Sequence, residues 1–430
     1  DDGVGIEEEG STRVKVQHRY YDYHDDYTKK VLLFNESITS KVMGFVLEDV
    51  KKVEGIRVKM MLNKLVQPSQ VDTRILSGTS IGTGNYILEV GLGTPTKTLR
   101  VVIDTGSDLG WTQCKPCSGA NSCYSQKEPI FDPSGSSSYK SVPCDALLCK
   151  TVASTTTSGC TSTDICEYGI QYLDGSFTLG NVATDTLKVG SAQIPSYAFG
   201  CGLNNQGLFN GFDGLLGFSR NALAFPAQTR SRVFTYCLPS PFSTTATGFL
   251  EFGRTAAARG RSATPAVQFL PSNSAPFYEV SLSSLRVNSR SVIGPSGGGS
   301  LIIDSGTVIT RLDSAIYFQV RDAFRRGTTK LPPAPSDAGQ GLFDTCYKLK
   351  VGSTVTIPSV TFALGNAGLL FTPPATSLLY PMDDTGTVCF AFAPIKSGTA
   401  SSILGNYQQQ GFSFSFDIAH NSLSIKPNAC

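Results

Sequence analysis

Histidine is scarce in this sequence. Its 430 residues contain only His18, His24 and His420. Serine and cysteine hydrolases need a general base beside the nucleophile, and that base is usually histidine. Two of the three lie near the start of the chain, and the third lies in the turn-like segment Ala419-His420-Asn421. We therefore do not expect a nucleophile–histidine triad.

Excess charge and long apolar runs are also missing. The formal net charge is +2, which favours neither a nucleic-acid binder nor a protein selective for acidic partners. No run of about 18 apolar residues occurs, so no membrane span is expected. The length and the 40% of hydrophobic residues are sufficient for two packed domains and a further segment.

Cysteine, in contrast, is plentiful. Seven of the 12 cysteines crowd one stretch rich in Ser, Thr and Gly: Cys114, Cys117, Cys123, Cys144, Cys149, Cys160 and Cys166. An even number in such a context favours disulfides and an oxidising compartment. The alternative is metal binding by Cys114-Lys115-Pro116-Cys117, but no second C-x-x-C follows at zinc-site spacing. We expect disulfides and no metal, and spacing alone leaves their connectivity open.

One motif occurs twice. Val101-Val102-Ile103-Asp104-Thr105-Gly106-Ser107 is repeated as Leu301-Ile302-Ile303-Asp304-Ser305-Gly306-Thr307. The apolar run indicates a buried strand, and the short residues after the acid indicate a tight turn. Two such strand ends facing each other would hold Asp104 and Asp304 in one site of low dielectric. There the two carboxylates share a proton and can supply a general acid and a general base.

A second pair of motifs accompanies the acid turns. Gly214-Leu215-Leu216-Gly217 and Ile403-Leu404-Gly405 each follow an acid turn by roughly a hundred residues. A lone Asp-Thr-Gly is a weak signal because turns favour Asp and Gly. The full set, over residues 81 to 430, resembles the pepsin-type aspartic proteases. Details similar to the plant nepenthesin-like (chloroplast-nucleoid-protease-like) branch are Trp111-Thr112-Gln113-Cys114, Phe199-Gly200-Cys201-Gly202 and the segment 403–410.

The resemblance implies a mainly β, bilobal pepsin-like acid protease fold of two related β-lobes. Alternation in Tyr86–Gly93 and short apolar segments between Gly, Ser and Pro agree with strands. We expect a first catalytic lobe at 81–255, which includes the Cys-rich insertion, and a second at 256–430. Helices are expected over 221–229 and 313–326, the latter capped by Asp313.

Residues 1 to 80 differ in composition. They contain 25 charged residues, against 45 in the remaining 350. Apolar residues at three- and four-residue steps in 46–54 and 56–65 predict an amphipathic helix broken near Gly55. We expect a partly helical propeptide, with a solvated flexible extension as the alternative. The opening residues contain no apolar leader, so any signal peptide is expected to be already removed, and Asn35-Glu36-Ser37 is a glycosylation sequon.

The resemblance also implies roles for residues around the dyad of Asp104 and Asp304. The residues after each acid, Thr105 and Ser305, are expected to link the two turns. Gly106 and Gly306 complete these turns, while Ser107 and Thr307 are placed to bond the outer carboxylate oxygens. Simple turn stabilisation is the alternative for these hydroxyls. No cofactor and no metal are expected.

A flap hairpin is expected at Ile170–Ser176. The resemblance implies that Tyr172 covers the substrate and that Trp111 is its hydrogen-bond partner. Leu173 stands where the family commonly has Gly, which would stiffen the tip. Gly217-Phe218-Ser219-Arg220 also departs from the usual Gly-rich continuation.

The pattern of the plant branch implies a set of six disulfides. These are Cys114–Cys117, Cys123–Cys201, Cys144–Cys166, Cys149–Cys160, Cys237–Cys430 and Cys346–Cys389.

The expected function is an aspartic endopeptidase, made as a zymogen whose own propeptide lies across the substrate cleft. We expect polypeptide substrates, a monomer, and a secreted (apoplastic) or vacuolar location, with the chloroplast as the alternative. The second class is a weak or inactive binding protein, either glycosidase-inhibitor-like or DNA-binding through Arg254–Arg261 and Arg321–Lys330. Intact acids at 104 and 304 disfavour that class.

Overall fold

The computed structural model describes residues 72–117, 122–172, 174–209, 211–240, 247–253, 266–271, 276–294, 298–366, 368–395, 401–427 and 429–430. The chain divides into the units Asp1–Arg57 and Val58–Cys430, and all described residues belong to the second. The amphipathic segments at 46–65, Asn35, Leu173 and Arg254–Arg261 lie outside the described residues.

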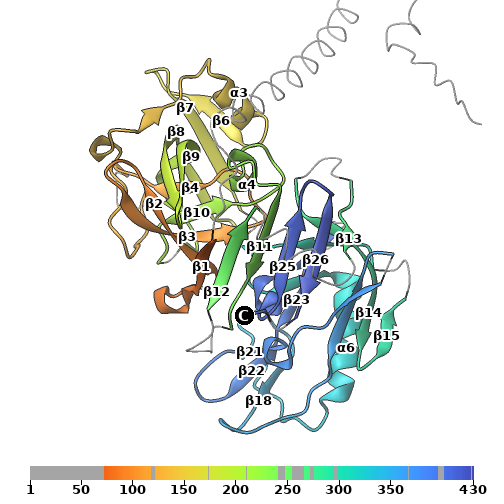
Figure 1. Cartoon of the computed structure of the whole chain (residues 1–430). Coiled ribbons are helices and arrows are strands. Elements are labelled where there is room, and N and C mark those ends of the chain that lie inside the picture. Colours follow the sequence, from red (N-terminus) through yellow and green to blue (C-terminus); the bar gives the residue numbers. More distant parts are fainter. Residues whose placement is uncertain are drawn as a thin grey trace, which may run out of the picture. The chain divides into compact units, whose positions relative to one another are not determined.

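The larger sheet has 15 strands, and it contains strands from both halves of the sequence (Figure 1). From the first half come β1 (Asp72–Ser77), β2 (Tyr86–Leu92), β3 (Lys97–Asp104), β4 (Trp111–Gln113), β5 (Lys140–Ser141), β6 (Thr157–Cys160), β7 (Cys166–Gln171), β8 (Phe177–Val189), β9 (Ala192–Gln206), β10 (Gly214–Gly217), β11 (Val233–Cys237) and β12 (Gly248–Phe252). From the second half come β13 (Val267–Gln268), β25 (Ser413–Asp417) and β26 (Ser422–Lys426).

The halves meet where β11 pairs antiparallel with β25. Phe234 of β11 stacks on Phe416 of β25 with ring centroids 4.5 Å apart, and both side chains are fully buried. The sheet therefore does not follow the expected lobe boundary at residue 256, because strands after that boundary complete the sheet of the first half.

Strand β1 lies within the segment expected to be the propeptide, which is predicted to end at residue 80. Strand β1 pairs with β12, Asp72 facing Glu251, and with β2, Ser77 facing Tyr86. Its residues are thus part of the folded body. Only Ile75 of this strand is buried, so the segment carries little hydrophobic signal.

The second half forms two further sheets. One has eight strands: β14 (Glu279–Val287), β15 (Arg290–Ile293), β16 (Ser300–Ile303), β17 (Thr310–Asp313), β19 (Val360–Leu364), β20 (Leu369–Phe371), β23 (Phe392–Ile395) and β24 (Ser401–Leu404). Its order is β20-β19-β14-β16-β24-β17-β23, with β15 paired to β14. The other consists of β18 (Cys346–Lys348), β22 (Thr387–Phe390) and β21 (Leu379–Pro381).

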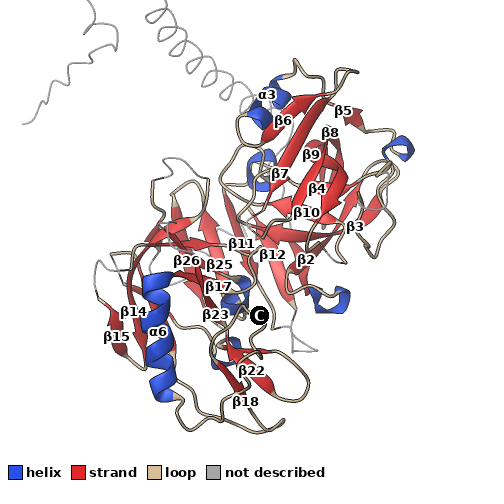
Figure 2. Cartoon of the chain, turned by 180° about the vertical axis from the view of Figure 1, so that it is seen from behind, coloured by secondary structure: helices blue, strands red, loops and turns tan. Residues whose placement is uncertain are grey.

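Helices are few in the described part of the chain, as expected for a mainly β fold (Figure 2). They are α3 (Leu147–Ala153), α4 (Phe225–Gln228), α6 (Ser314–Gly327), α7 (Asn406–Gln409) and the 3-10 turns η2 (Gly78–Ile81), η3 (Pro133–Gly135) and η4 (Ala375–Ser377). The helix expected over 221–229 is reduced to α4, and α3 was not expected. Among the described residues we find no helix long and apolar enough to span a membrane.

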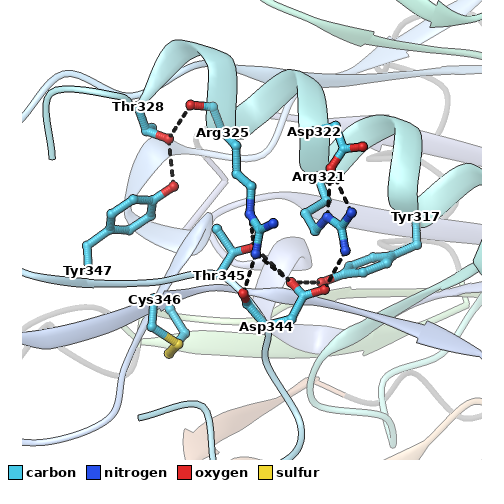
Figure 3. A network of polar contacts seen from close by, with 10 residues as sticks. Tyr317, Arg321, Asp322, Arg325, Thr328, Asp344, Thr345, Cys346 and Tyr347 are labelled. Atoms are coloured by element: carbon cyan, nitrogen blue, oxygen red, sulfur yellow. Dashed lines mark hydrogen bonds and ion pairs between the residues drawn. A yellow bond between two sulfur atoms is a disulfide. The ribbon is translucent and has the colours of Figure 1, made fainter. Parts of the chain in front are cut away.

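Helix α6 follows the sequence prediction closely. Asp313 caps it by accepting a hydrogen bond from Ala315 N at 2.9 Å, and Val320 and Phe324 are fully buried. Arg321 donates to Asp344 at 2.8 Å, and Tyr317 OH donates to the same carboxylate at 2.6 Å (Figure 3). These contacts hold the helix against the segment that leads into β18.

Candidate active site

Each aspartate of the duplicated motif ends a buried strand. Asp104 is the last residue of β3, which runs parallel to β10 with Asp104 beside Gly217. Asp304 follows β16, which runs parallel to β24 with Ile303 beside Leu404. The apolar-apolar-Gly motifs are therefore the partner strands of the two acid strands.

The two turns are linked by reciprocal hydrogen bonds. Thr105 N donates to Ser305 Oγ at 3.1 Å, and Ser305 N donates to Thr105 Oγ1 at 2.9 Å. Each hydroxyl also donates to the backbone of the opposite acid strand, Thr105 to Ile303 O at 2.9 Å and Ser305 to Ile103 O at 2.8 Å. Because both side chains are fully buried, these four bonds are shielded from water.

The glycines allow the two acids to approach each other. A Cβ at Gly106 would lie 2.9 Å from Asp304 Oδ1, and a Cβ at Gly306 would lie closer still to Asp104 Oδ1. Any side chain at either position would therefore occupy the space of the opposite carboxyl group. Each glycine N–H donates to Oδ1 of the aspartate in its own turn at 2.8 Å.

The outer carboxylate oxygens are bonded by hydroxyls. Thr307 Oγ1 donates to Asp304 Oδ2 at 2.6 Å, and Ser107 Oγ donates to Asp104 Oδ2. Both contacts correspond to the positions that the resemblance implies. Each acid therefore has one oxygen on a glycine N–H and the other on a hydroxyl.

Burial raises the pKa of Asp104 well above its usual range, and the charge of Asp304 raises it further. The hydrogen bonds from Ser107 and Gly106 act in the opposite direction. Only 6% of Asp104 is exposed, so water does little to stabilise its charge. The pair is thus suited to hold one proton between two carboxyl groups, as a general acid and base require.

The main chain holds the two acids in different ways. Asp104 O accepts a hydrogen bond from Phe218 N at 2.7 Å. The equivalent donor in the second half would be Asn406 N, but this group donates to Thr307 O at 2.7 Å where α7 begins. The carbonyl of Asp304 is therefore left for another donor.

Gln409 supplies that donor. Its Nε2 donates to Asp304 O at 3.1 Å and to Leu404 O at 2.9 Å, and its Oε1 accepts from Tyr236 OH at 2.5 Å. Gln409 is fully buried. Sequence reasoning noted the segment 403–410 but gave Gln409 no role, and its unusual run of three glutamines was the available signal.

Tyr172 and Trp111, the residues expected in and beside the flap, are in direct contact. Trp111 Nε1 donates to Tyr172 OH at 2.7 Å. The Tyr172 hairpin is closed by Tyr172 N, which donates to Ser176 O at 2.8 Å. Burial raises the pKa of Tyr172 well above its usual value, with a further contribution from the charge of Asp104, so the phenol remains protonated.

An aromatic cluster that was not foreseen supports this pair. Phe209 packs edge-on against Trp111 and Tyr172, with ring centroids 5.0 Å and 5.8 Å away. Tyr124, from the Cys-rich insertion, contacts Phe209 at 5.4 Å. The insertion therefore contributes directly to the packing beneath the flap.

Four of the expected disulfides are wrong. The structure pairs Cys114–Cys201, Cys117–Cys123, Cys144–Cys160 and Cys149–Cys166 in place of Cys114–Cys117, Cys123–Cys201, Cys144–Cys166 and Cys149–Cys160. The bonds Cys237–Cys430 and Cys346–Cys389 are present as expected.

Local geometry explains the differences. Strand β4 runs parallel to β9 with Thr112 beside Cys201, and Cys114 N donates to Gly202 O at 2.9 Å, which places Cys114 next to Cys201. In the hairpin of β6 and β7, Cys166 points into the core and bonds the buried Cys149 of α3. Cys160, which faces Cys166 across the hairpin, is exposed and bonds Cys144. Among the described residues, no group of three His, Cys, Asp or Glu side chains could hold a metal ion.

Comparisons with known proteins agree with this geometry. Residues 86–254 match the family model described as Xylanase inhibitor N-terminal, and residues 277–427 match Xylanase inhibitor C-terminal. Protein ASPARTIC PROTEASE IN GUARD CELL 2 of Arabidopsis thaliana is 40% identical over 367 residues, which are 83% of this chain and 75% of that protein. Aspartic proteinase nepenthesin-1 of Nepenthes gracilis is 34% identical over 386 residues, 87% of this chain and 83% of that protein.

Solved structures share the fold at lower identity. Basic 7S globulin from soybean superposes with a TM-score of 0.65 at 20% identity, covering 84% of this chain and 97% of that chain. Conglutin gamma from lupine seeds gives 0.63 at 18% identity, covering 84% and 95%. These two likenesses concern the fold alone. From the sequence relatives and the family models together, the chain belongs to the plant nepenthesin-like branch of the pepsin-type aspartic proteases, a family of aspartic endopeptidases.

Proposed function

We propose that this chain hydrolyses internal peptide bonds with a water molecule activated between Asp104 and Asp304. The observation that carries the proposal is the pair of facing acid turns, each with a glycine N–H on one carboxylate oxygen and a hydroxyl on the other. Such fixed hydrogen bonds hold both carboxyl groups in place before the substrate arrives.

The chemistry needs one proton on the pair. The ionised carboxylate takes a proton from the water, and the water oxygen attacks the scissile carbonyl carbon. The protonated carboxyl donates to the carbonyl oxygen as its negative charge develops. When the tetrahedral intermediate collapses, the C–N bond breaks and the proton taken from water passes to the leaving nitrogen. One hydroxyl of the intermediate returns its proton to the carboxylate that had donated one, which restores the singly protonated pair. No covalent enzyme intermediate forms.

Replacement of each acid tests the proposal. Asp104→Asn and Asp304→Asn should each reduce kcat on a quenched-fluorescence peptide by at least 1,000-fold. The single carboxylate that remains in each variant cannot carry both proton transfers. A statine-type mimic of the intermediate should block the wild-type enzyme. Full activity in either variant would show that another group performs the chemistry.

The N-terminal segment is proposed to inhibit the enzyme until acidification. Its predicted amphipathic stretch carries basic residues, Lys51, Lys52, Arg57, Lys59 and Lys64, that can pair with carboxylates. Protonation of those carboxylates at low pH would weaken the pairing. Because β1 belongs to the sheet, we expect the new N-terminus at or before Asp72.

Sequencing the N-terminus after incubation at pH 3.5 tests this activation. The Asp304→Asn variant, treated in the same way, shows whether the enzyme makes the cut itself. An intact chain that is as active as the shortened one would mean that the segment is not an inhibitor.

We propose a secreted or vacuolar location, supported by the six disulfides, which persist in oxidising compartments. Peptide mapping of the unreduced protein, purified from its tissue, should find no alkylatable thiol. Several free thiols in that material would place the protein in a reducing compartment.

Inhibition of a glycosidase is the competing function, because the matching family models are named after xylanase inhibitors. An inhibitor does not need the dyad, whereas this chain keeps both acids with their full hydrogen-bond sets. A xylanase assay with wild type and Asp304→Asn separates the two. Equal inhibition by both proteins, without peptide cleavage by wild type, would favour the inhibitor. DNA binding gains no support from α6, where Arg321 and Arg325 already pair with Asp344.

A further inference from the structure

A row of four residues crosses the sheet that carries Asp304. Strand pairing places Glu279 beside Ile302, Ile302 beside Ile403, and Ile403 beside Arg311. Side chains that are paired in this way lie on the same face of a sheet. The row therefore runs from an acid at one end, over two isoleucines, to an arginine at the other.

This face is the one on which Asp304 lies. Leu301 and Ile303, which flank Ile302, are fully buried and pack into the core, and Leu404 beside Ile403 does the same. Ile302 and Ile403 are only partly buried. By the two-residue period of a strand, Asp304 follows Ile302 on the partly exposed face.

Arg311 has no partner on this face. Among the described residues its side chain takes part in no hydrogen bond or ion pair, and the strands on either side of it, β23 and β24, contain no charged residue. Asp313, two positions along the same strand, is occupied as the cap of α6. Glu279, at the far end of the row, accepts hydrogen bonds from Ser300 and Ser401.

The guanidinium is nevertheless partly withdrawn from water. Arg311 is half-buried, and burial lowers its pKa from the usual value. Arginine remains charged under such conditions, so the cost of burial is offset only when an anion binds it. The described residues of the chain supply no such anion near it.

The distance to the dyad suits a peptide substrate. Two strand spacings separate Arg311 from Ile302, about 10 Å, and Asp304 lies two residues further along, which gives about 12 Å between the Cα atoms of Arg311 and Asp304. An extended peptide advances about 3.3 Å per residue. A substrate residue near Arg311 is thus about two to four residues away from the bond under attack.

We propose that Arg311 is a specificity-determining residue that binds an acidic side chain of the peptide substrate, about two to four residues from the scissile bond. The proposal rests on the proposed endopeptidase function. The planar guanidinium can donate a hydrogen bond to each oxygen of a carboxylate, and a neutral amide of the same size cannot accept this pair of bonds.

Paired substrates test the preference. Quenched peptides that differ only by Glu or Gln, scanned over four positions on each side of the cleaved bond, are assayed at pH 5.5 with the acid-activated full chain. We expect kcat/KM to favour Glu by about 10-fold at one or two positions, the gain typical of a charge-assisted pair. The ratio should fall to near 1 in Arg311→Met and should invert toward Lys-containing peptides in Arg311→Glu.

Arg290→Met is the matched control. Arg290 is exposed on β15, which pairs with residues 285–287 of β14 and not with β16, β24 or β17, and the Glu/Gln ratio should stay at its wild-type value in this variant. An unchanged ratio in Arg311→Met would overturn the proposal, because it would mean that the arginine only extends its stem along the apolar face with its charge in water.

A binding arm separates failure of this proposal from failure of the proposed function. In Asp304→Asn, competition with a fluorescent peptide should give a dissociation constant about 10-fold lower for Glu than for Gln peptides, and Arg311→Met in that background should remove the difference. If wild type cleaves no peptide but the Glu/Gln difference in binding is present, the peptidase function is refuted and acid recognition by Arg311 remains supported. Equal binding in both backgrounds would refute acid recognition alone.

Discussion

Thr105 and Ser305, 200 residues apart in sequence, each place a hydroxyl oxygen on the backbone N–H of the other. The arrangement is symmetric, as expected from a duplicated motif, and it fixes the spacing of the two acids that follow Ile103 and Ile303. Rigid placement of this kind is what a reaction with two proton transfers requires.

Substitution of Thr105 or Ser305 should therefore lower both the free energy of unfolding and the rate of catalysis. Thr105→Val leaves Ser305 N without an acceptor in a buried site, and we expect a loss of about 1–3 kcal/mol in the free energy of unfolding. Ser305→Ala removes the other two of the four bonds in the same buried linkage. Because residues in direct contact are energetically coupled, the double variant should cost less than the sum of the single ones. Urea unfolding measures the three values.

Thr354→Val, at an exposed position, serves as the control and should change the stability by less than 0.5 kcal/mol, as is typical of surface sites. Strict additivity of Thr105→Val and Ser305→Ala would contradict the linkage between the turns.

Gln409→Leu removes the side-chain donor to Asp304 O. The variant leaves this carbonyl and Tyr236 OH without their partner, at about 1–3 kcal/mol for each buried group. We expect kcat per active site, counted by titration with a tight inhibitor, to fall by about 10-fold with KM nearly unchanged, because the position of Asp304 is disturbed. Exposed Gln319→Leu is the matched control. If Gln409→Leu keeps its kcat per titrated site, the residue stabilises the fold without positioning Asp304.

Trp111 and Tyr172 should act as one unit. Tyr172→Phe leaves the indole N–H unpaired, and we expect kcat/KM to fall by about 10-fold, with Trp111→Phe giving a similar loss and the double variant little more. Trp111 is the only tryptophan of the chain, so its emission reports on the flap directly. The spectrum should change in Tyr172→Phe and stay the same in Tyr380→Phe. Independent, additive losses would mean that the bond between the two does not matter for turnover.

The stability of the fold should depend on pH through Asp213. Burial raises its pKa to about 6, against about 3.9 in an unfolded chain. Since the folded state binds this proton more tightly, the contribution is complete below about pH 4 and is lost as the pH rises through 6. We expect a loss of up to about 2 kcal/mol between pH 4 and 7 from this group.

Asp213→Asn should flatten this dependence without abolishing it, because the raised pKa of Asp104 acts in the same direction. Unfolding in urea at pH 4, 5.5 and 7 gives the slope for each protein. A slope as steep in the variant as in wild type would rule out Asp213 as its source.

The acid turns were predictable because their contacts are local. An apolar strand, an acid, and a glycine two residues on are sufficient to place Gly106 N and Ser107 Oγ on Asp104. The cap and buried stripe of α6 are equally local. The family pattern then supplied the cross-link between Thr105 and Ser305, which spacing alone does not reveal.

Other features depend on contacts that no short motif encodes. Gln409 reaches Asp304 across 105 residues, and only because α7 diverts Asn406 N from the symmetric position. The inner disulfide of Cys149 and Cys166 follows from the burial of Cys166, whereas Cys160, its partner across the hairpin, is exposed. Strand β1 escaped prediction because its pairing with β12, and not its apolar content, makes it part of the sheet.

The bond between Cys237 and Cys430 joins the end of β11 to the last residue of the chain. Residues 241–246 follow β11 closely, and a protease that cuts there would leave β12 and β25 on one fragment and β11 on the other. Those strands remain hydrogen-bonded neighbours, and the sulfur bridge ties the fragments covalently. The product would be a two-chain enzyme that migrates as a single band until reductant is added.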